Sequence, residues 1–165
     1  MAKPMRPEGL DFLDRAPVQV RAETTIAAPP AAVWAPIADT PTWTEWFVGM
    51  REARVTSEGP FGVGSTRTVV VPPLTVDEAI LAFEPEARFA FHFVTATPPL
   101  LVAMVEDVAL EAVADGATTR VVYRQSCEPA PWARPMAPIL RRQLRSKVEA
   151  SLVGLDRWVL AHAAR

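Results

Sequence analysis

The sequence contains few of the side chains that most often carry out chemistry in small proteins. Cys127 is the only cysteine, and there are two histidines and one tyrosine. A single cysteine excludes an intramolecular disulfide and a zinc site built on cysteines. His92 and His162 lie far apart in the chain, which argues against a histidine metal site. We therefore expect neither a metal ion nor another cofactor.

Strong charge and long apolar runs are also missing. The formal net charge is -2 over 165 residues, without a tail of one sign. Proteins that bind nucleic acid are usually strongly basic, so we expect no nucleic-acid partner. The longest apolar run, residues 98–105, is too short to cross a bilayer, and residues 1–17 lack the apolar segment of a secretory signal. A cytoplasmic protein without a transmembrane segment is predicted.

Strand patterns fill most of the chain, separated by clusters of proline. Residues 18–26 alternate between apolar and polar side chains, as in a strand with one wet face. Residues 28–46 hold two short apolar segments, which are expected to form two short helices. Further strands are predicted at 50–57, 63–71, 74–83, 87–96, 101–113 and 117–127. The connections are too short for crossover helices, so the sheet is predicted to be antiparallel.

The last part of the chain has the period of a long helix. Apolar residues recur there at spacings of three and four: Leu140, Leu144, Val148, Leu152, Leu155 and Val159. These positions share one face of an α-helix. We predict a helix over residues 132–163, with its regular part beginning near Pro138, because proline suits a first turn. Its apolar face needs a long partner surface, which the predicted sheet would provide.

Several local motifs occur in an order that resembles a known superfamily. The first is Ile26-Ala27-Ala28-Pro29-Pro30-Ala31-Ala32-Val33-Trp34, followed by Asp39 and by Trp43-Thr44-Glu45-Trp46. A glycine-marked turn follows at residues 60–64, then Phe83-Glu84-Pro85 and a second glycine-marked element at 116–121. Together they resemble the SRPBCC superfamily of START-like, helix-grip proteins, and within it the bacterial polyketide cyclase and dehydrase relatives.

The resemblance implies an α+β helix-grip fold. In that fold a curved, seven-stranded antiparallel sheet wraps around the long C-terminal helix, and two short helices follow the first strand. We expect a single domain over residues 17–165, with residues 1–16 as a flexible leader. The resemblance also implies a cavity between sheet and helix, although one fold can host many functions.

Strand alternation predicts which side chains face this cavity. The expected ligand-binding residues are Trp46, Phe61, Phe89, Phe91, Phe93, Met104, Glu106, Tyr123, Gln125, Arg141, Leu144 and Val148. Glu106, Tyr123 and Gln125 stand out because each is polar on an otherwise apolar strand face, where a polar group needs a partner. Glu106 and Tyr123 are the best candidates for catalysis. Alternatively, Glu106 lies at a wet strand end, and Tyr123 and Gln125 satisfy each other or the backbone.

The other candidates also have structural alternatives. The three phenylalanines either line the cavity or fill the core, and Trp46 is either a ligand contact or a plug between the short helices and the sheet. Phe61 lies in a glycine-rich turn and would gate the cavity mouth. Arg141 lies at the edge of the apolar stripe and would reach an anionic headgroup.

Two functions fit these features. The first is binding of a hydrophobic small molecule: a lipid, a quinone, an isoprenoid or an aromatic polyketide. The second is a polyketide cyclase, aromatase or dehydratase that uses Glu106 or Tyr123 for proton transfer. An interaction protein is a third possibility, but the sequence shows no large apolar or charged surface for that purpose.

Overall fold

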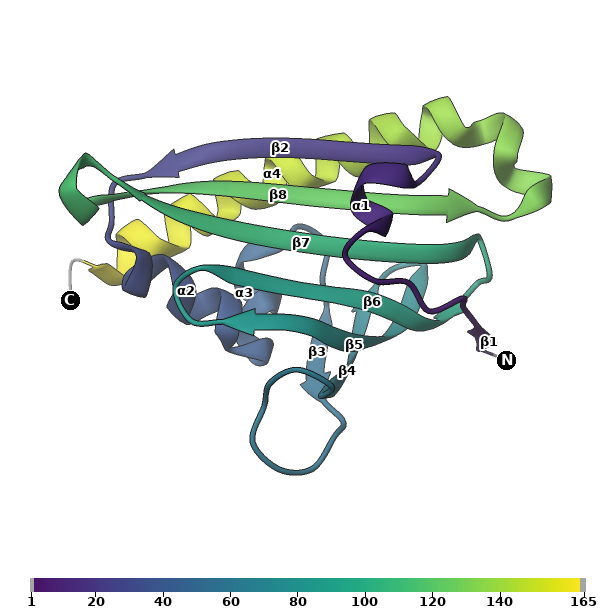
Figure 1. Cartoon of the computed structure of the whole chain (residues 1–165), viewed down its shortest axis with the longest axis horizontal. Helices are drawn as coiled ribbons and strands as arrows, with labels where there is room; N and C mark the ends of the chain where they lie inside the picture. Colours follow the sequence, from purple (N-terminus) through teal and green to yellow (C-terminus); the bar gives the residue numbers. More distant parts are fainter. Residues whose placement is uncertain (1, 164–165) are drawn as a thin grey trace.

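A strongly curved antiparallel sheet dominates the computed structural model, which describes residues 2–163 (Figure 1). Its strands lie in the order β2-β8-β7-β6-β5-β4-β3. Their bounds are β2 Val18–Ile26, β3 Glu52–Val55, β4 Thr66–Val71, β5 Leu74–Glu84, β6 Arg88–Thr97, β7 Leu101–Val113 and β8 Thr118–Pro129. A short 3-10 turn, η2 (Ala114–Gly116), joins β7 to β8. The predicted antiparallel sheet of seven strands is confirmed as the main sheet, and a short eighth strand pairs with β6.

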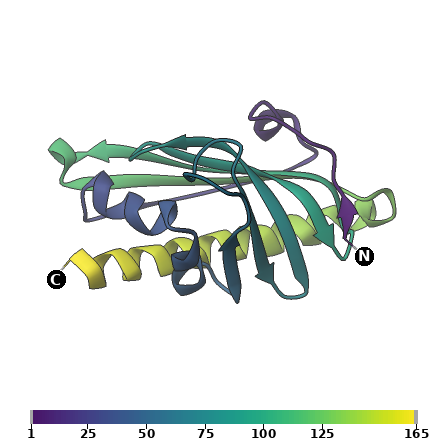
Figure 2. The same cartoon turned by 90° about the horizontal axis from the view of Figure 1, so that it is seen from below.

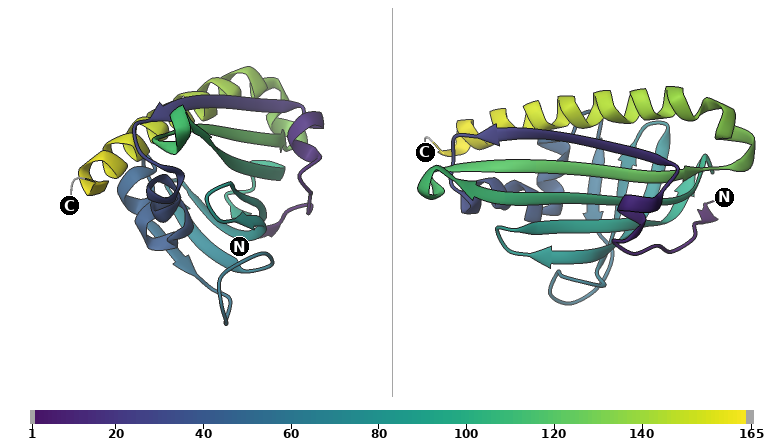
Figure 3. Two further views of the ribbon diagram at one scale, coloured as in Figure 1. Left: turned by 60° about the vertical axis from the view of Figure 1, so that its left-hand side comes forward. Right: turned by 45° about the horizontal axis from the view of Figure 1, so that its top comes forward.

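The long helix α4 (Ala137–Ala163) lies across the concave side of the sheet (Figures 2 and 3). A 3-10 segment, η3 (Pro131–Met136), precedes it, so the helix begins next to Pro138 as expected. Val148, Leu152, Leu155 and Val159 of the apolar stripe are buried. The stripe is only half buried near the start of α4, where the helix and the sheet diverge.

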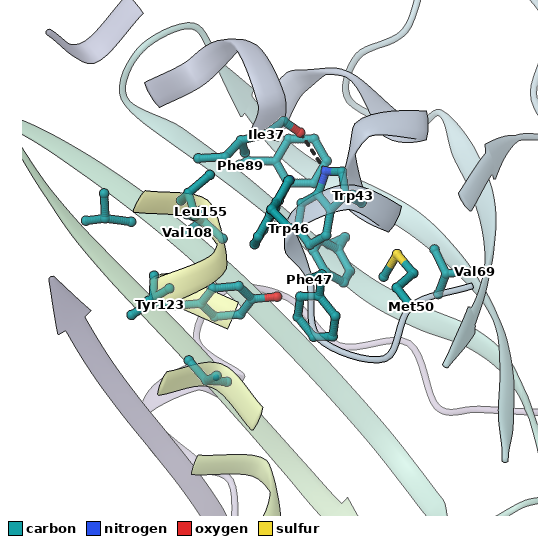
Figure 4. Packing of buried hydrophobic residues seen from close by; sticks show 14 of the residues in the cluster. Ile37, Trp43, Trp46, Phe47, Met50, Val69, Phe89, Val108, Tyr123 and Leu155 are labelled. Carbon is teal, nitrogen blue, oxygen red and sulfur yellow. Dashed lines mark hydrogen bonds between the residues drawn. The ribbon is translucent and has the colours of Figure 1, made fainter. Parts of the chain in front are cut away.

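Two short helices after β2 fill one end of the space between sheet and helix, as predicted. They are α2 (Pro30–Ala38) and α3 (Trp43–Trp46), joined by the 3-10 turn η1 (Thr40–Thr42). The indole N–H of Trp43 donates to the carbonyl of Ile37 at 2.8 Å (Figure 4). The indole N–H of Trp46 donates to the carbonyl of Pro36 at 3.2 Å. Both indoles are buried with satisfied N–H groups, so this end of the molecule is a packed core.

The segment predicted as a flexible leader is instead packed against the sheet. Its short strand β1 (Lys3–Pro4) pairs with β6, and its helix α1 (Phe12–Arg15) lies on the outer face. Phe12 and Leu13 are buried there against Ala103 and Val105. Burial of these two apolar side chains offsets the entropy lost in ordering the segment, which explains the difference from the prediction. Met1 lies outside the described residues.

This segment also bridges a split in the sheet. Pairing between β6 and β7 extends only to His92 and Val105, and beyond these residues the two strands diverge. The backbone N–H of Met5 donates to the carbonyl of Val94 on β6 at 2.9 Å, and that of Arg6 donates to Val102 on β7 at 2.8 Å. The N-terminal segment thus supplies backbone hydrogen bonds to both strands.

Close packing of α3 against α4 depends on Gly154. A Cβ atom at this position would lie 2.2 Å from the carbonyl oxygen of Trp46, which is a backbone atom that cannot easily move away. Alanine normally stabilises a helix by roughly 0.5–1 kcal/mol relative to glycine. Here we expect Gly154→Ala to lower the free energy of unfolding by about 1–3 kcal/mol, measured by urea denaturation.

Glu149→Ala, on the exposed side of the same helix, is the control and should change stability by less than about 0.5 kcal/mol. A Gly154→Ala protein as stable as the parent would contradict the close contact between the helices.

Candidate functional site

A cavity of about 890 Å³ lies between the sheet and the N-terminal half of α4. Close-packed interiors contain few voids larger than a water molecule, and small-molecule sites typically measure about 300–1,000 Å³. The exposed residues Val48, Pro72, Pro73 and Ile139 mark its mouth, together with Leu100. The size and the side opening are those of a small-molecule site.

The wall of the cavity is mainly apolar. Its apolar side chains come from β4 to β7, from α4 and from the segment after α3, and they include Phe47, Met50, Val69, Val76, Phe91, Phe93, Leu101, Met104, Leu140 and Leu144. Phe91, Phe93, Met104 and Leu144 are among the predicted ligand-binding residues. Alternation along β6 and β7 directs the first three inward, as the sequence indicates.

A hydrogen-bonded polar cluster lies at the inner end of the cavity. The carboxyl of Glu106 on β7 lies beside Gln125, its register partner on β8. The Tyr123 hydroxyl donates to Oε2 of Glu106 at 2.5 Å, and the Gln125 amide donates to the same oxygen at 2.9 Å. All three side chains are buried, and Oε1 of Gln125 has no hydrogen-bond donor among residues 2–163. The structure therefore brings the three predicted polar residues together.

A buried ion pair in the same wall was not predicted from the sequence. Arg67 on β4 and Glu78 on β5 are register partners, and Nε of Arg67 lies 2.6 Å from the Glu78 carboxylate. Nη1 and Nη2 of Arg67 have no hydrogen-bond acceptor within residues 2–163. The guanidinium instead stacks 4.2 Å from the ring centre of Trp43 and 4.6 Å from that of Phe91. Arg67 and Val69 are two residues apart on β4 and therefore share a strand face, which was the signal in the sequence that Arg67 points inward.

Burial shifts the pKa of the carboxyl groups in this cluster. It raises the pKa of Glu106 from 4.5 to about 7, and the negative charge of Glu78 adds to the rise. The hydrogen bonds from Tyr123 and Gln125 and the charge of Arg67 oppose it. Burial also raises the pKa of Glu78 against the effect of Arg67, and it raises the pKa of Tyr123 well above its usual value. Near neutral pH, Glu106 is therefore partly protonated.

Three of the predicted aromatic contacts lie outside the cavity wall. Trp46 is one of the two buried plugs, and Phe89 is packed among the rings of Trp34, Trp43 and Phe83. Phe61 stacks on Phe89, with ring centres 6.4 Å apart, and so does not gate the mouth. These residues belong to the packed end of the molecule, because the short helices fill the space there.

Two predicted helix residues also lie elsewhere. Val148 is fully buried in the packed core rather than in the cavity wall. Arg141 donates to the backbone carbonyl of Pro17 at 3.3 Å, on the side of α4 that faces β2. The basic residues of α4 that do border the cavity are Arg142 and Lys147.

A second hollow of about 530 Å³ lies between α3 and the C-terminal half of α4. It is bordered by Trp46, Gly154, Trp158 and His162, and the Trp158 indole donates to Glu45 at 2.8 Å. The buried side-chain polar atoms that lack a partner within residues 2–163 all belong to other parts of the chain. The larger cavity is therefore the stronger candidate site.

Comparison with known proteins agrees with the fold and the cavity. Residues 17–159 match the protein family described as "Polyketide cyclase / dehydrase and lipid transport". The chain belongs to this family. It also has relatives of similar length: uncharacterised proteins of Mycobacterium tuberculosis and Mycobacterium bovis are 30 % identical over 157 residues, which is 94 % of this chain and 93 % of theirs.

Solved structures show the same fold at low sequence identity. A START superfamily protein from Mycobacterium smegmatis has a TM-score of 0.73 at 10 % identity, and the match covers 87 % of this chain and 98 % of that one. The Zhui aromatase/cyclase from Streptomyces has a TM-score of 0.65 at 21 % identity, over 89 % and 93 % of the two chains. These likenesses establish the fold of this family member, the START-like helix grip.

Within residues 2–163, no helix combines the length and apolar character needed to cross a bilayer. The same part of the chain brings together no three histidine, cysteine, aspartate or glutamate side chains that could hold a metal ion.

The two ends of the α4 stripe should respond differently to truncation. Leu155 is fully buried in the core, whereas Leu144 is half buried and borders the cavity. We expect Leu155→Ala to lower the free energy of unfolding by about 2–5 kcal/mol and Leu144→Ala to lower it by roughly 1 kcal/mol. Urea denaturation measures both, and equal large losses would indicate a filled core at Leu144.

The raised pKa of Glu106 predicts a pH-dependent stability. Between about pH 4.5 and pH 7 the folded state keeps a proton that the unfolded state releases, so the free energy of unfolding falls as pH rises through this range. Glu106→Gln cannot ionise and should lack this loss. The free energy of unfolding of the variant minus that of wild type should increase by about 2–3 kcal/mol from about pH 5 to pH 8, measured by urea denaturation. Parallel pH profiles for the two proteins would contradict a buried, protonated Glu106.

Proposed function

We propose that this protein binds a hydrophobic small molecule in the cavity between the sheet and α4. The ligand belongs to the range of lipids, quinones, isoprenoids and aromatic polyketides. The observation that supports this most directly is the cavity itself, about 890 Å³ with a largely apolar wall and a polar cluster at its inner end. An empty cavity of this size lowers stability, because its lining atoms lack packing partners, and a bound ligand would supply those contacts.

The polar cluster would fix the orientation of the ligand. A small number of placed polar groups in an apolar pocket is the usual design of a small-molecule site. Glu106, held by Tyr123 and Gln125, provides one such group on a rigid pair of strands. The family description, which includes lipid transport, agrees with a binding function.

The pKa of Glu106 favours a second candidate function. A carboxyl group with a pKa of about 7 is well suited to act as a general acid near neutral pH. The protein would then be a cyclase, aromatase or dehydratase in which Glu106 transfers the proton. Tyr123, which donates its hydroxyl hydrogen to Glu106, would position the carboxyl.

Binding in the cavity is tested by titration with Nile red, an uncharged apolar dye whose fluorescence rises when it leaves water. Leu144→Trp adds bulk inside the cavity and should weaken dye binding at least about tenfold. Glu149→Trp makes the same kind of change on the exposed side of α4 and is the matched control. Equal dye affinity in the Leu144→Trp and Glu149→Trp proteins would refute a ligand site in this cavity.

Glu106→Gln separates binding from catalysis. The molecule that copurifies with wild type is identified by native mass spectrometry, and its mass is followed during incubation with fresh wild type or Glu106→Gln. If the protein is an enzyme, wild type changes the molecule, for example by loss of water, and the variant is slower by about 100-fold or more. If the protein only binds, the molecule keeps its mass with both proteins.

A further inference from the structure

The charged residues of the cavity wall are sorted by position. Arg67, Glu78 and Glu106 are buried at the inner end. Arg142, which is exposed, and Lys147, which is half buried, belong to α4 on the side of the mouth. Both carboxyl groups of the wall thus lie inside, and the two cations that are not held by them lie outside.

The inner end is unsuited to an anionic group. The single cation there, Arg67, is paired through Nε with Glu78 at 2.6 Å, and this carboxylate balances its charge. Its Nη1 and Nη2, which have no acceptor within residues 2–163, belong to a guanidinium that stacks on the rings of Trp43 and Phe91. Glu106 is a second carboxyl without a cationic partner of its own, and an ionised ligand group beside it would add a further negative charge. Uncompensated charge in a buried site is strongly unfavourable. A ligand group placed here is therefore uncharged.

The inner end does offer hydrogen bonds to an uncharged group. The donors Tyr123 and Gln125 both bind Oε2 of Glu106, so the other carboxyl oxygen, Oε1, is not held by them. A protonated Glu106 can donate to a carbonyl oxygen of the ligand. Oε1 of Gln125, which lacks a donor among residues 2–163, would accept from a neighbouring hydroxyl.

The mouth has the opposite character. Arg142 and Lys147 form no ion pair with another residue of the range 2–163. They line the same cavity as the exposed apolar residues Val48 and Ile139, and the acidic side chains of the wall are the two at the inner end. Cations beside an apolar opening match a ligand whose outer end is negatively charged and whose body is apolar.

We propose that the cavity selects an elongated amphiphile, with an uncharged carbonyl end at Glu106 and an anionic end at Arg142 and Lys147. This inference rests on the proposed binding function and adds the ligand's chemistry and direction. It makes Arg67 part of the inner wall rather than a receptor for a carboxylate, although a buried arginine in an apolar cavity would suggest such a receptor.

Three ten-carbon probes test both ends at about neutral pH: decanoate, 2-decanone and 9-oxodecanoate. Each is used to displace Nile red from wild type. We expect 9-oxodecanoate to bind roughly three- to fivefold more tightly than either of the other probes, because only it meets both the carboxyl group inside and the cations outside.

Variants assign each end of the probe to a residue. Arg142→Gln with Lys147→Gln should reduce the affinity for 9-oxodecanoate to that for 2-decanone and leave 2-decanone unchanged. Glu106→Leu should reduce it to the affinity for decanoate, whereas Glu106→Gln, which keeps a donor, should retain most of the affinity. Arg145→Gln is the matched control, because Arg145 is an exposed arginine of α4 outside the cavity wall.

The opposite orientation gives a different result. If the carboxylate enters first, decanoate binding should weaken when Arg67 and Glu78 are both replaced by methionine, and it should not respond to the changes at Arg142 and Lys147. That outcome, or equal affinity for decanoate and 9-oxodecanoate, overturns this inference while dye binding still supports the proposed function. If Leu144→Trp and Glu149→Trp bind Nile red with equal affinity, the proposed function itself is refuted.

Discussion

Contact between α4 and the concave face of the sheet changes along the helix, and the cavity depends on this change. At the C-terminal half, Leu152, Leu155 and Val159 are buried against β2 and the short helices, where Trp43 and Trp46 fill the remaining volume. At the N-terminal half, Leu140 and Leu144 face the cavity instead. Because a sheet twists and curves while a helix runs nearly straight, the two surfaces cannot stay in contact along 27 residues. The packed end provides stability, and the open end provides space.

The polar groups in the wall contribute little to stability, and under the proposed function they serve to recognise the ligand. A buried ion pair such as Arg67 and Glu78 gains little net free energy, because both charges must leave water. Glu106 adds a carboxyl group whose ionised form is disfavoured by burial, so that it is only partly ionised near neutral pH. Apolar side chains of similar volume at these positions would give a more stable protein. Their presence therefore agrees with a protein that uses the space for a ligand.

The fold and the polar cluster were predictable from sequence for the same reason. Alternation along a strand has a period of two, so Phe91, Met104 and Glu106 could be assigned to the inward face before the strands were paired. Alternation does not show whether an inward-facing residue lies at the packed end of the molecule or at the cavity. Phe89 shares a strand face with Phe91, yet it lies among the aromatic rings at the packed end. Val148 belongs to the same apolar stripe of α4 as Leu144, yet it is buried in the packed core.

Features that depend on pairing were harder to predict. To predict the ion pair of Arg67 and Glu78, one must know the register in which β4 and β5 pair. The apolar pattern of two short strands does not specify that register. Arg141 and Arg142 are neighbours in sequence, but a rotation of about 100° per residue places only Arg142 at the cavity. The N-terminal segment has too few apolar residues to show a period, although Phe12 and Leu13 suffice to hold it.

The split between β6 and β7 gives the N-terminal segment a protective role. Beyond His92 and Val105 the two strands present backbone groups that the other strand does not pair. Lys3, Met5 and Arg6 lie over these groups and use some of their hydrogen-bonding capacity. A chain from which residues 2–6 had been cut would present two short β edges beside an apolar cavity. Such edges accept strands from other molecules, so proteolytic trimming of this segment would favour self-association.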